Sequence, residues 1–344
     1  MLAFLLLFVA MLALCDIFWI IKWRYTKCKG VLPPGSIRLP FVGETLELIF
    51  PSYSLDIHPF FKKRIQKYGP IFQSNIACQP IVISVDPEFN NHIITQNGIS
   101  VELWYLSTFS KLFALEGESK TNITGSIHKF IRKAILNRLG TESLKEKFLP
   151  RIENMVKETL YSWSNQDVVD VKYDVSSTIC NFTYKLLCDY DGKGSHDKLS
   201  ESFTIFSESL LGFPLNIPGT KYHTCLKNKE TVLSILRKRI EQKRASQVEK
   251  QAGEDDFLDL ALKQNEIDSY FTDDFIMNLL FASLFATFDS ISIIIILMLK
   301  LLSSHPPVLL QLMVEHERIL QNRRPDCPIT WEEYKSMTYT HQVI

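Results

Sequence analysis

The chain has 344 residues, of which 46% are hydrophobic and 22% are charged, so it can bury a sizeable core as one or two domains. Lys and Arg together number 38, as do Asp and Glu, and this balance excludes recruitment of nucleic acid by bulk charge. The 7 cysteines show neither paired spacing nor a C-x-x-C or Cys/His zinc pattern, which indicates reduced cytosolic thiols.

Residues 1–21 predict a membrane anchor, because they form an apolar run that spans a bilayer core when helical. Basic residues follow directly at Lys22 and Arg24, and the positive-inside rule places such residues on the cytosolic side. No basic segment precedes the run and no small-residue cleavage site closes it, which favours a retained signal-anchor over a cleaved signal peptide. Asp16 interrupts the run and keeps an amphipathic helix on the membrane surface as an alternative.

Residues 22–36 are basic and then proline-rich, and we interpret them as a stiff hinge that holds residues 37–344 near the membrane. Beyond the hinge, the pattern predicts a mainly α body with a small β region. Asp86 followed by Pro87 is typical of a helix N-cap and first helical position, and Gly98 is the expected stop of that helix. Strands are predicted at 71–76 and 81–85, and other helices near 60–68, 127–139, 144–163, 172–188, 198–211, 223–248, 255–263, 272–303, 306–322 and 331–337.

The most informative element is a long apolar helix that begins after Thr272 and ends near Ser303. Thr272 is a good N-cap, and the acidic residues Asp273 and Asp274 occupy the first turn, where the helix dipole favours negative charge. About thirty residues give a helix roughly 45 Å long, enough to cross a domain. Asp289 lies near its centre, and burial of a carboxylate is unfavourable unless the group is paired, solvated or neutralised.

Three interpretations of this helix are open: a second transmembrane span, a buried core helix, or a central helix that delivers protons to a cofactor. Asn278 and Asp289 argue against exposure to lipid, because polar and charged groups at the bilayer centre are rare. Ala282, Ala286 and Ser290 share one face at i, i+4 spacing. That face is flat enough for a large group to lie against it.

The helix core at 286–290 reads ATFDS and resembles the oxygen-activating motif of cytochromes P450, with Thr287 in place of a Gly and Ser290 in place of the usual Thr. Other blocks resemble, in the same order, the proline-rich hinge, the following GETL block and the third-helix motif of microsomal plant P450s. A loop typical of the plant clan that acts on sterols, triterpenes and brassinosteroids follows, and then three short downstream segments. These blocks are 32–36, 39–45, 128–132, 213–220, 305–306, 315–317 and 330–334.

This resemblance implies a partial cytochrome P450 fold that is mainly α, with an N-terminal membrane anchor helix. It implies haem as the cofactor and NADPH-cytochrome P450 reductase as the partner that supplies electrons. The implied reaction is hydroxylation of an apolar isoprenoid such as a sterol or triterpenoid. The implied location is the endoplasmic reticulum membrane, with a single anchor and the body facing the cytosol.

The resemblance also assigns roles to single residues. Asp289 and Ser290 are the expected catalytic pair, in which the hydroxyl holds oxygen or a water and the acid relays protons. His128, Arg132 and Ala286 are the expected cofactor-binding residues, the first two at the haem propionates, although the family often has a Trp at position 128. The alternatives are that the His and Arg are ordinary surface residues and that the Ser hydroxyl is bonded to the carbonyl at 286.

Substrate contacts are expected from Trp104, Phe206, Phe213 and Ala282, which are aromatic or small and suit a flat apolar substrate. The alternative for all four is ordinary core packing.

The iron-binding cysteine of this family lies in a glycine- and arginine-bearing loop that follows an E-x-x-R helix, and none of the 7 cysteines has that context. The sequence therefore predicts no metal ligand within the chain and a C-terminal truncation. A truncated, haem-free P450 remnant without catalytic activity is the alternative function. A membrane protein with two spans is a third possibility.

Overall fold

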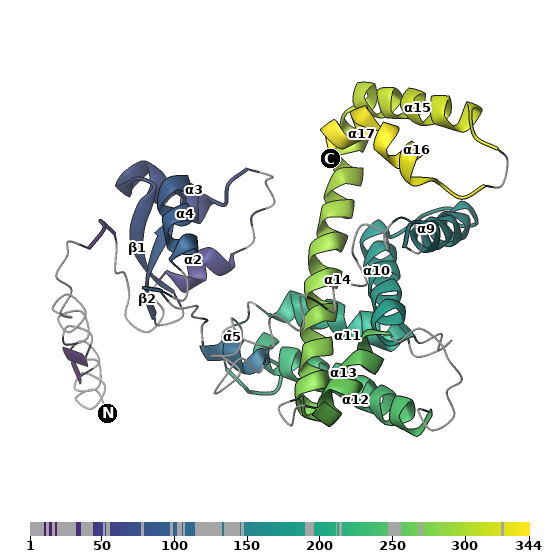
Figure 1. Ribbon diagram of the computed structural model, residues 1–344. Coiled ribbons are helices and arrows are strands. Elements are labelled where there is room, and N and C mark those ends of the chain that lie inside the picture. Colours follow the sequence, from purple (N-terminus) through teal and green to yellow (C-terminus); the bar gives the residue numbers. More distant parts are fainter. Residues whose placement is uncertain are drawn as a thin grey trace. The chain divides into compact units, whose positions relative to one another are not determined.

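The computed structural model divides into two compact units, Met1–Ser107 with Leu211–Phe213, and Thr108–Leu210 with Pro214–Ile344 (Figure 1). The structure describes residues 10–11, 14–15, 18, 32–35, 44–50, 52, 56–76, 79–96, 99–101, 105, 107–113, 133, 145, 148–189, 196–210, 212, 215–246, 256–267, 271–324 and 327–344. The predicted helix at 127–139, apart from residue 133, and most of the predicted anchor, residues 1–21, lie outside these residues.

The first unit is built on a two-stranded antiparallel sheet (Figure 1). Its elements are, in chain order, α2 (Thr45–Ile49), α3 (Pro59–Tyr68), β1 (Ile71–Ile76), β2 (Gln79–Ser84) and α4 (Pro87–Thr95). A small core forms where Phe60 of α3 packs with Phe72 and Ile76 of β1. The second strand begins before the predicted position 81, because Ile76 pairs with Gln79 and closes the hairpin at once.

A buried ion pair joins three elements of this unit. Arg64 of α3 is 5% exposed, and its Nη2 lies 2.7 Å from Oε1 of Glu44, which directly precedes α2. The hydroxyl of Ser74 on β1 donates to Oε2 of the same carboxylate at 2.6 Å. Because removal of Arg64 would leave the carboxylate of Glu44 buried without a cation, this pair fixes how α2, α3 and β1 pack.

The end of the predicted hinge is attached to the sheet. The backbone N–H of Gln73 donates to the carbonyl of Pro34 at 2.9 Å, and Gly35 forms a parallel bridge with Gln73. A Cβ added at Gly35 would lie 2.4 Å from the carbonyl oxygen of Gln73, so this close approach requires a glycine. Residues 32–35 are therefore part of the sheet edge, and only the earlier part of the hinge is left to act as a spacer.

We predict that Gly35→Ala destabilises the first unit by about 1–3 kcal/mol, because the new methyl group forces the hinge away from β1. Urea unfolding of the purified chain, followed by circular dichroism, measures the effect. Gln66→Ala, on the exposed face of α3, is the matched control and should leave the midpoint unchanged. An unchanged midpoint for both variants would show that the hinge does not depend on this contact.

The second unit is helical in its described part, and its longest helix is α14 (Figure 1). The helices are α5 (Ser107–Leu112), α9 (Leu149–Ser164), α10 (Val171–Cys188), α11 (His196–Ser209), α12 (Lys221–Ser246), α13 (Phe257–Ile267), α14 (Asp273–Ser304), α15 (Pro306–Gln321), α16 (Trp331–Ser336) and α17 (Thr338–Val343). Helices α10 to α13 surround the N-terminal half of α14, and α15 to α17 lie at its C-terminal end. Helix α17 is not predicted from the sequence.

Local capping explains two of the predicted helix starts. Oδ1 of Asp86 accepts a hydrogen bond from the N–H of Phe89 at 2.7 Å, and Pro87 takes the first position of α4. In the same way, the hydroxyl oxygen of Thr272 accepts from the N–H of Phe275 at 3.2 Å and starts α14. Both predicted starts are confirmed, since each depends on a side chain close to the backbone group that it caps.

A buried lysine joins α12 to α13. Lys243 is 3% exposed and pairs with Asp256, while its Nζ also lies 3.2 Å from Oδ2 of Asp259. The backbone N–H of Asp259 donates to Oδ1 of Asp256, which caps the start of α13. Two carboxylates therefore satisfy a cation that would be costly to bury alone, and they fix the end of α12 against α13.

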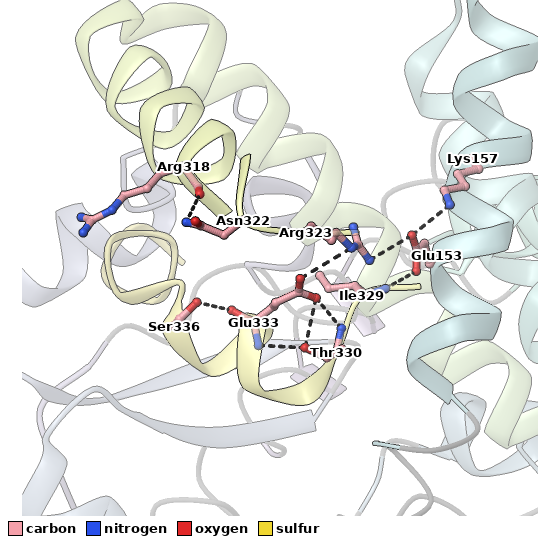
Figure 2. Close-up of polar contacts among 9 residues, drawn as sticks. All are labelled: Glu153, Lys157, Arg318, Asn322, Arg323, Ile329, Thr330, Glu333 and Ser336. Carbon is pink, nitrogen blue, oxygen red and sulfur yellow. Dashed lines mark hydrogen bonds and ion pairs between the residues drawn. The ribbon is translucent and has the colours of Figure 1, made fainter. Parts of the chain in front are cut away.

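Glu153 of α9 holds the segment that leads into α16 (Figure 2). Its Oε2 accepts the backbone N–H of Ile329 at 2.6 Å, and its Oε1 lies 2.9 Å from Nζ of Lys157 and 3.5 Å from Nη2 of Arg323. In Figure 2, Arg323 lies between Glu153 and Glu333, and Nε of the arginine is 3.6 Å from Oε1 of Glu333. The latter glutamate completes a capping box with Thr330 at the start of α16.

Burial opposes ionisation of Glu153, but the N–H of Ile329 and the charges of Lys157 and Arg323 hold its pKa below the ordinary value of 4.5. A carboxyl whose folded pKa is lowered contributes its full stabilisation above the unfolded pKa and loses it as pH falls through the folded pKa. The ionised Glu153 therefore stabilises the unit at neutral pH and ceases to do so in acid.

We predict that Glu153→Ala lowers the free energy of unfolding at pH 7 by about 1–3 kcal/mol, because it leaves the half-buried N–H of Ile329 without its acceptor and Arg323 with Glu333 as its remaining partner. The difference from the wild type should shrink as pH falls below 4.5. Denaturant unfolding at several pH values measures both effects. Glu158→Ala, on the exposed face of the same helix, controls for helix propensity, and an equal effect of the two substitutions would contradict the assignment.

Candidate functional site

Asp289 lies near the middle of α14, half-buried, and has a partner on another helix. Its Oδ1 accepts a hydrogen bond from the hydroxyl of Ser207 on α11 at 2.5 Å. This bond offsets part of the cost of placing a carboxylate in an apolar helix. The sequence shows the acid but not its partner, which lies 82 residues away along the chain.

The hydroxyl of Ser290 donates to the carbonyl of Ala286 at 2.5 Å, which is the local alternative raised by the sequence. Thr287 and Ser283 do the same, each donating at 2.8 Å to the carbonyl four residues earlier. The hydroxyl proton of Ser290 is therefore engaged in a hydrogen bond within α14. Its side chain is exposed, and the lone pairs of its oxygen remain able to accept a hydrogen bond from another group.

Helix α14 has one buried and one open face. Leu280 and Leu284 are fully buried, whereas Ala286 and Ser290 on the opposite face are exposed. The open face continues towards the C-terminus through Ile293, which is 55% exposed, and through further aliphatic residues. The exposed side chains in the middle of this face, Ala286 and Ser290, are small, so they leave room for a large planar group such as haem.

Two of the residues expected to contact substrate, Phe206 and Ala282, lie at one aromatic cluster, formed by α11, α14, and α5 with the residue after it, Phe113. The ring of Phe206 lies 6.0 Å from that of Phe113, 5.2 Å from Phe281 and 5.3 Å from Phe285, centroid to centroid. Phe206 is fully buried, so its observed environment is that of a core residue. Ala282 is half-buried and packs against the same cluster.

Phe285 is a candidate substrate contact that the sequence does not single out. It is half-buried, and its ring lies 5.1 Å from that of Phe113 at the border of the cluster. It is three residues from Ala282 and four from Asp289, so the three side chains share one side of α14. The feature of the sequence that could have identified Phe285 is its spacing of four residues from Asp289, which places both on one side of a helix.

Four other predicted site residues, namely Trp104, His128, Arg132 and Phe213, lie outside the described residues. Their roles stay predictions.

The buried cysteines of the second unit are held as thiols. Burial raises the pKa of Cys180 to about 12 and that of Cys225 to about 11. Burial and the charge of Asp256 raise the pKa of Cys188 as well, although Arg239 and Lys243 oppose the shift. Cys180, Cys188 and Cys225 are also fully buried in the core cluster, so none of their sulfurs is accessible to the iron of a haem on the open face of α14. The open face of α14 thus fits the plane of haem, whereas the buried thiols do not fit its axial ligand.

Among the described residues, α14 is the helix long and apolar enough to cross a membrane. Length and composition alone do not distinguish a membrane span from the core helix of a soluble domain. In this structure the helix contacts α10, α12 and α13 along its N-terminal half, as a core helix does.

Comparison with known proteins identifies the family. Residues 33–344 match the family model of cytochrome P450. Cucurbitadienol 11-hydroxylase of Siraitia grosvenorii is 46% identical over 331 residues, which cover 95% of this chain and 69% of the relative. Beta-amyrin 16-alpha-hydroxylase of Maesa lanceolata is 42% identical, with 95% and 68% covered. Cytochrome P450 87A3 of Oryza sativa subsp. japonica is 36% identical, with 95% and 63% covered.

The fold agrees with this match. The retinoic acid-bound cyanobacterial CYP120A1 superposes with a TM-score of 0.72 at 21% identity, over 90% of this chain and 67% of that chain. The expected mainly helical P450 fold with a small sheet is confirmed. Helix α14, which carries the ATFDS sequence, is the longest described helix of this fold. The chain belongs to the cytochrome P450 family of monooxygenases, whose cofactor is haem and whose electrons come from a reductase.

Proposed function

We propose that this protein hydroxylates an apolar isoprenoid of the triterpenoid or sterol class. The observation that carries the proposal is the convergence of α5, α11 and α14 on an aromatic cluster beside Asp289. Phe285 and Ala282 form the border of this cluster on the side of α14 that carries the acid, where a flat apolar molecule could pack. The named activities of two relatives, on cucurbitadienol and beta-amyrin, support the same class.

Each proposed residue has a distinct task. When bound, haem supplies the activation of dioxygen and the insertion of one oxygen atom into an unactivated C–H bond. Asp289 holds and relays a proton at its carboxylate, and Ser290 accepts a hydrogen bond from a water. Ala286 leaves room for the plane of the cofactor, while Arg132 and His128 bind its propionates.

The proposed setting is the endoplasmic reticulum membrane. Residues 1–21 act as a single anchor, the basic residues after it lie in the cytosol, and the body receives electrons there from NADPH-cytochrome P450 reductase. The docking of Gly35 on β1 supports a short link between the anchor and the first unit. Such a link would keep the body close to the bilayer, from which an apolar substrate enters.

A haem-free P450 product without catalytic activity is the second candidate. The burial of three cysteines favours it, because Cys180, Cys188 and Cys225 lie fully buried in the core cluster, where their sulfurs are not accessible to a haem iron.

Expression of the full chain in yeast microsomes with a plant P450 reductase separates the two candidates. The difference spectrum of the reduced protein with carbon monoxide reports a haem–thiolate centre. Mass spectrometry of extracts supplied with cucurbitadienol, beta-amyrin or a sterol reports the addition of one oxygen atom. A thiolate spectrum with NADPH-dependent product supports the hydroxylase. Absence of both supports the haem-free product, and a thiolate spectrum without any oxidised isoprenoid would refute the proposed substrate class.

We predict that Asp289→Asn lowers product formation by roughly 10²-fold or more, because the amide cannot relay a proton. The ratio of product to NADPH consumed should fall while hydrogen peroxide release rises. Asp274→Asn, in the exposed first turn of the same helix, is the matched control and should keep the wild-type ratio. Equal ratios in the two variants would remove Asp289 from the mechanism.

A further inference from the structure

The bond between Ser207 and Asp289 joins two helices at the proposed acid. It runs from the hydroxyl of Ser207 on α11 to Oδ1 of Asp289 on α14 and measures 2.5 Å. Both residues are half-buried. No described lysine or arginine forms an ion pair with Asp289, so the serine hydroxyl is the group from another helix that orients this carboxylate in the described part of the chain.

The packing around Ser207 fixes its position. The preceding residue, Phe206, and Phe203 one turn earlier are both fully buried. The ring of Phe203 stacks on that of Phe281 at 5.4 Å and lies 5.8 Å from that of Phe288, the residue before Asp289. The aromatic contacts on both sides therefore set the register of α11 against α14, and this register brings the hydroxyl to the carboxylate.

A single hydroxyl has one proton to donate. Ser207 donates it to Oδ1, so the other oxygen of Asp289 stays available to a water or to another proton carrier. A hydroxyl donor also orients the carboxylate without neutralising it, as a paired lysine or arginine would do in part.

We propose that Ser207 is a positioning residue for the reaction: it fixes one oxygen of Asp289 so that the other is presented for proton transfer. This inference rests on the proposed function of Asp289 as the acid. Ser207 itself touches neither substrate nor cofactor in this account, and it acts through the carboxylate alone.

Four variants of the full chain test the proposal. Ser207→Ala removes the hydroxyl, and Ser207→Thr retains it. Thr204→Val removes a hydroxyl from the same helix that donates to the carbonyl of Ser200 at 2.9 Å and does not reach Asp289. Asp289→Asn removes the carboxylate. Thermal unfolding by circular dichroism confirms that each variant is folded.

The first readout is the infrared spectrum of protein labelled with ¹³C at the aspartate carboxyl carbon, which does not depend on turnover. A carboxylate that loses a strong hydrogen bond changes its stretching frequency. We expect Ser207→Ala to shift the band that Asp289→Asn removes, Ser207→Thr to restore its position, and Thr204→Val to leave it unchanged. A band that stays in place in Ser207→Ala would overturn the proposal.

The second readout is the ratio of product to NADPH consumed, measured in microsomes with the reductase. We expect Ser207→Ala to lower kcat and this ratio by about tenfold with KM unchanged, and Ser207→Thr to recover most of the loss. A wild-type ratio in Ser207→Ala, with Asp289→Asn impaired, overturns the role of Ser207 alone. A wild-type ratio in Asp289→Asn overturns the acid role of Asp289 and that of Ser207 with it.

Discussion

The burial of one face of α14 is the constraint on which the second unit depends. Leu280, Phe281 and Leu284 are fully buried on that face, and burial of each such side chain contributes about 1.5–3 kcal/mol. Because these residues pack in one core with residues of α10, α11 and α12, the rotation of α14 about its own axis is fixed. Ala286 and Ser290 must then lie on the open side. The orientation of the candidate site is therefore a consequence of core packing.

The same core places the acid and its partner. The aromatic contacts of Phe203 and Phe206 with α14 set the register of α11, and Ser207 follows from that register. A buried polar group is stabilised when its partner is held by packing, since little further ordering is then needed to form the bond. Hydrophobic packing therefore fixes the position of α11 relative to α14, and a single hydroxyl on α11 orients the carboxylate of Asp289.

The sequence predicts those features that depend on neighbouring residues. The start of α14 can be predicted because the side chain of Thr272 caps a backbone group only three residues away. The face that carries Ala286 and Ser290 can be predicted from helical spacing. Features that depend on distant residues are not accessible in this way. The hydrogen bond of Ser207 joins it to a residue 82 positions away, and the burial of Phe206 depends on the rings of Phe113, just after α5, and Phe281 of α14. The direction of the Ser290 hydroxyl is also undetermined by sequence, because the motif and the bond to the carbonyl of Ala286 use the same group.

The most direct test of this account is the reactivity of a cysteine placed on the open face of α14. Ala286→Cys should react rapidly with a maleimide in the folded chain, and added hemin should slow that reaction. Ala261→Cys, fully buried on α13, should stay unreactive with or without hemin, and peptide mapping separates both from the exposed Cys15 and Cys327. Rapid labelling at position 286 that hemin suppresses is the predicted result. Labelling at 286 as slow as at 261, or unaffected by hemin, would contradict the assignment of this face to the cofactor.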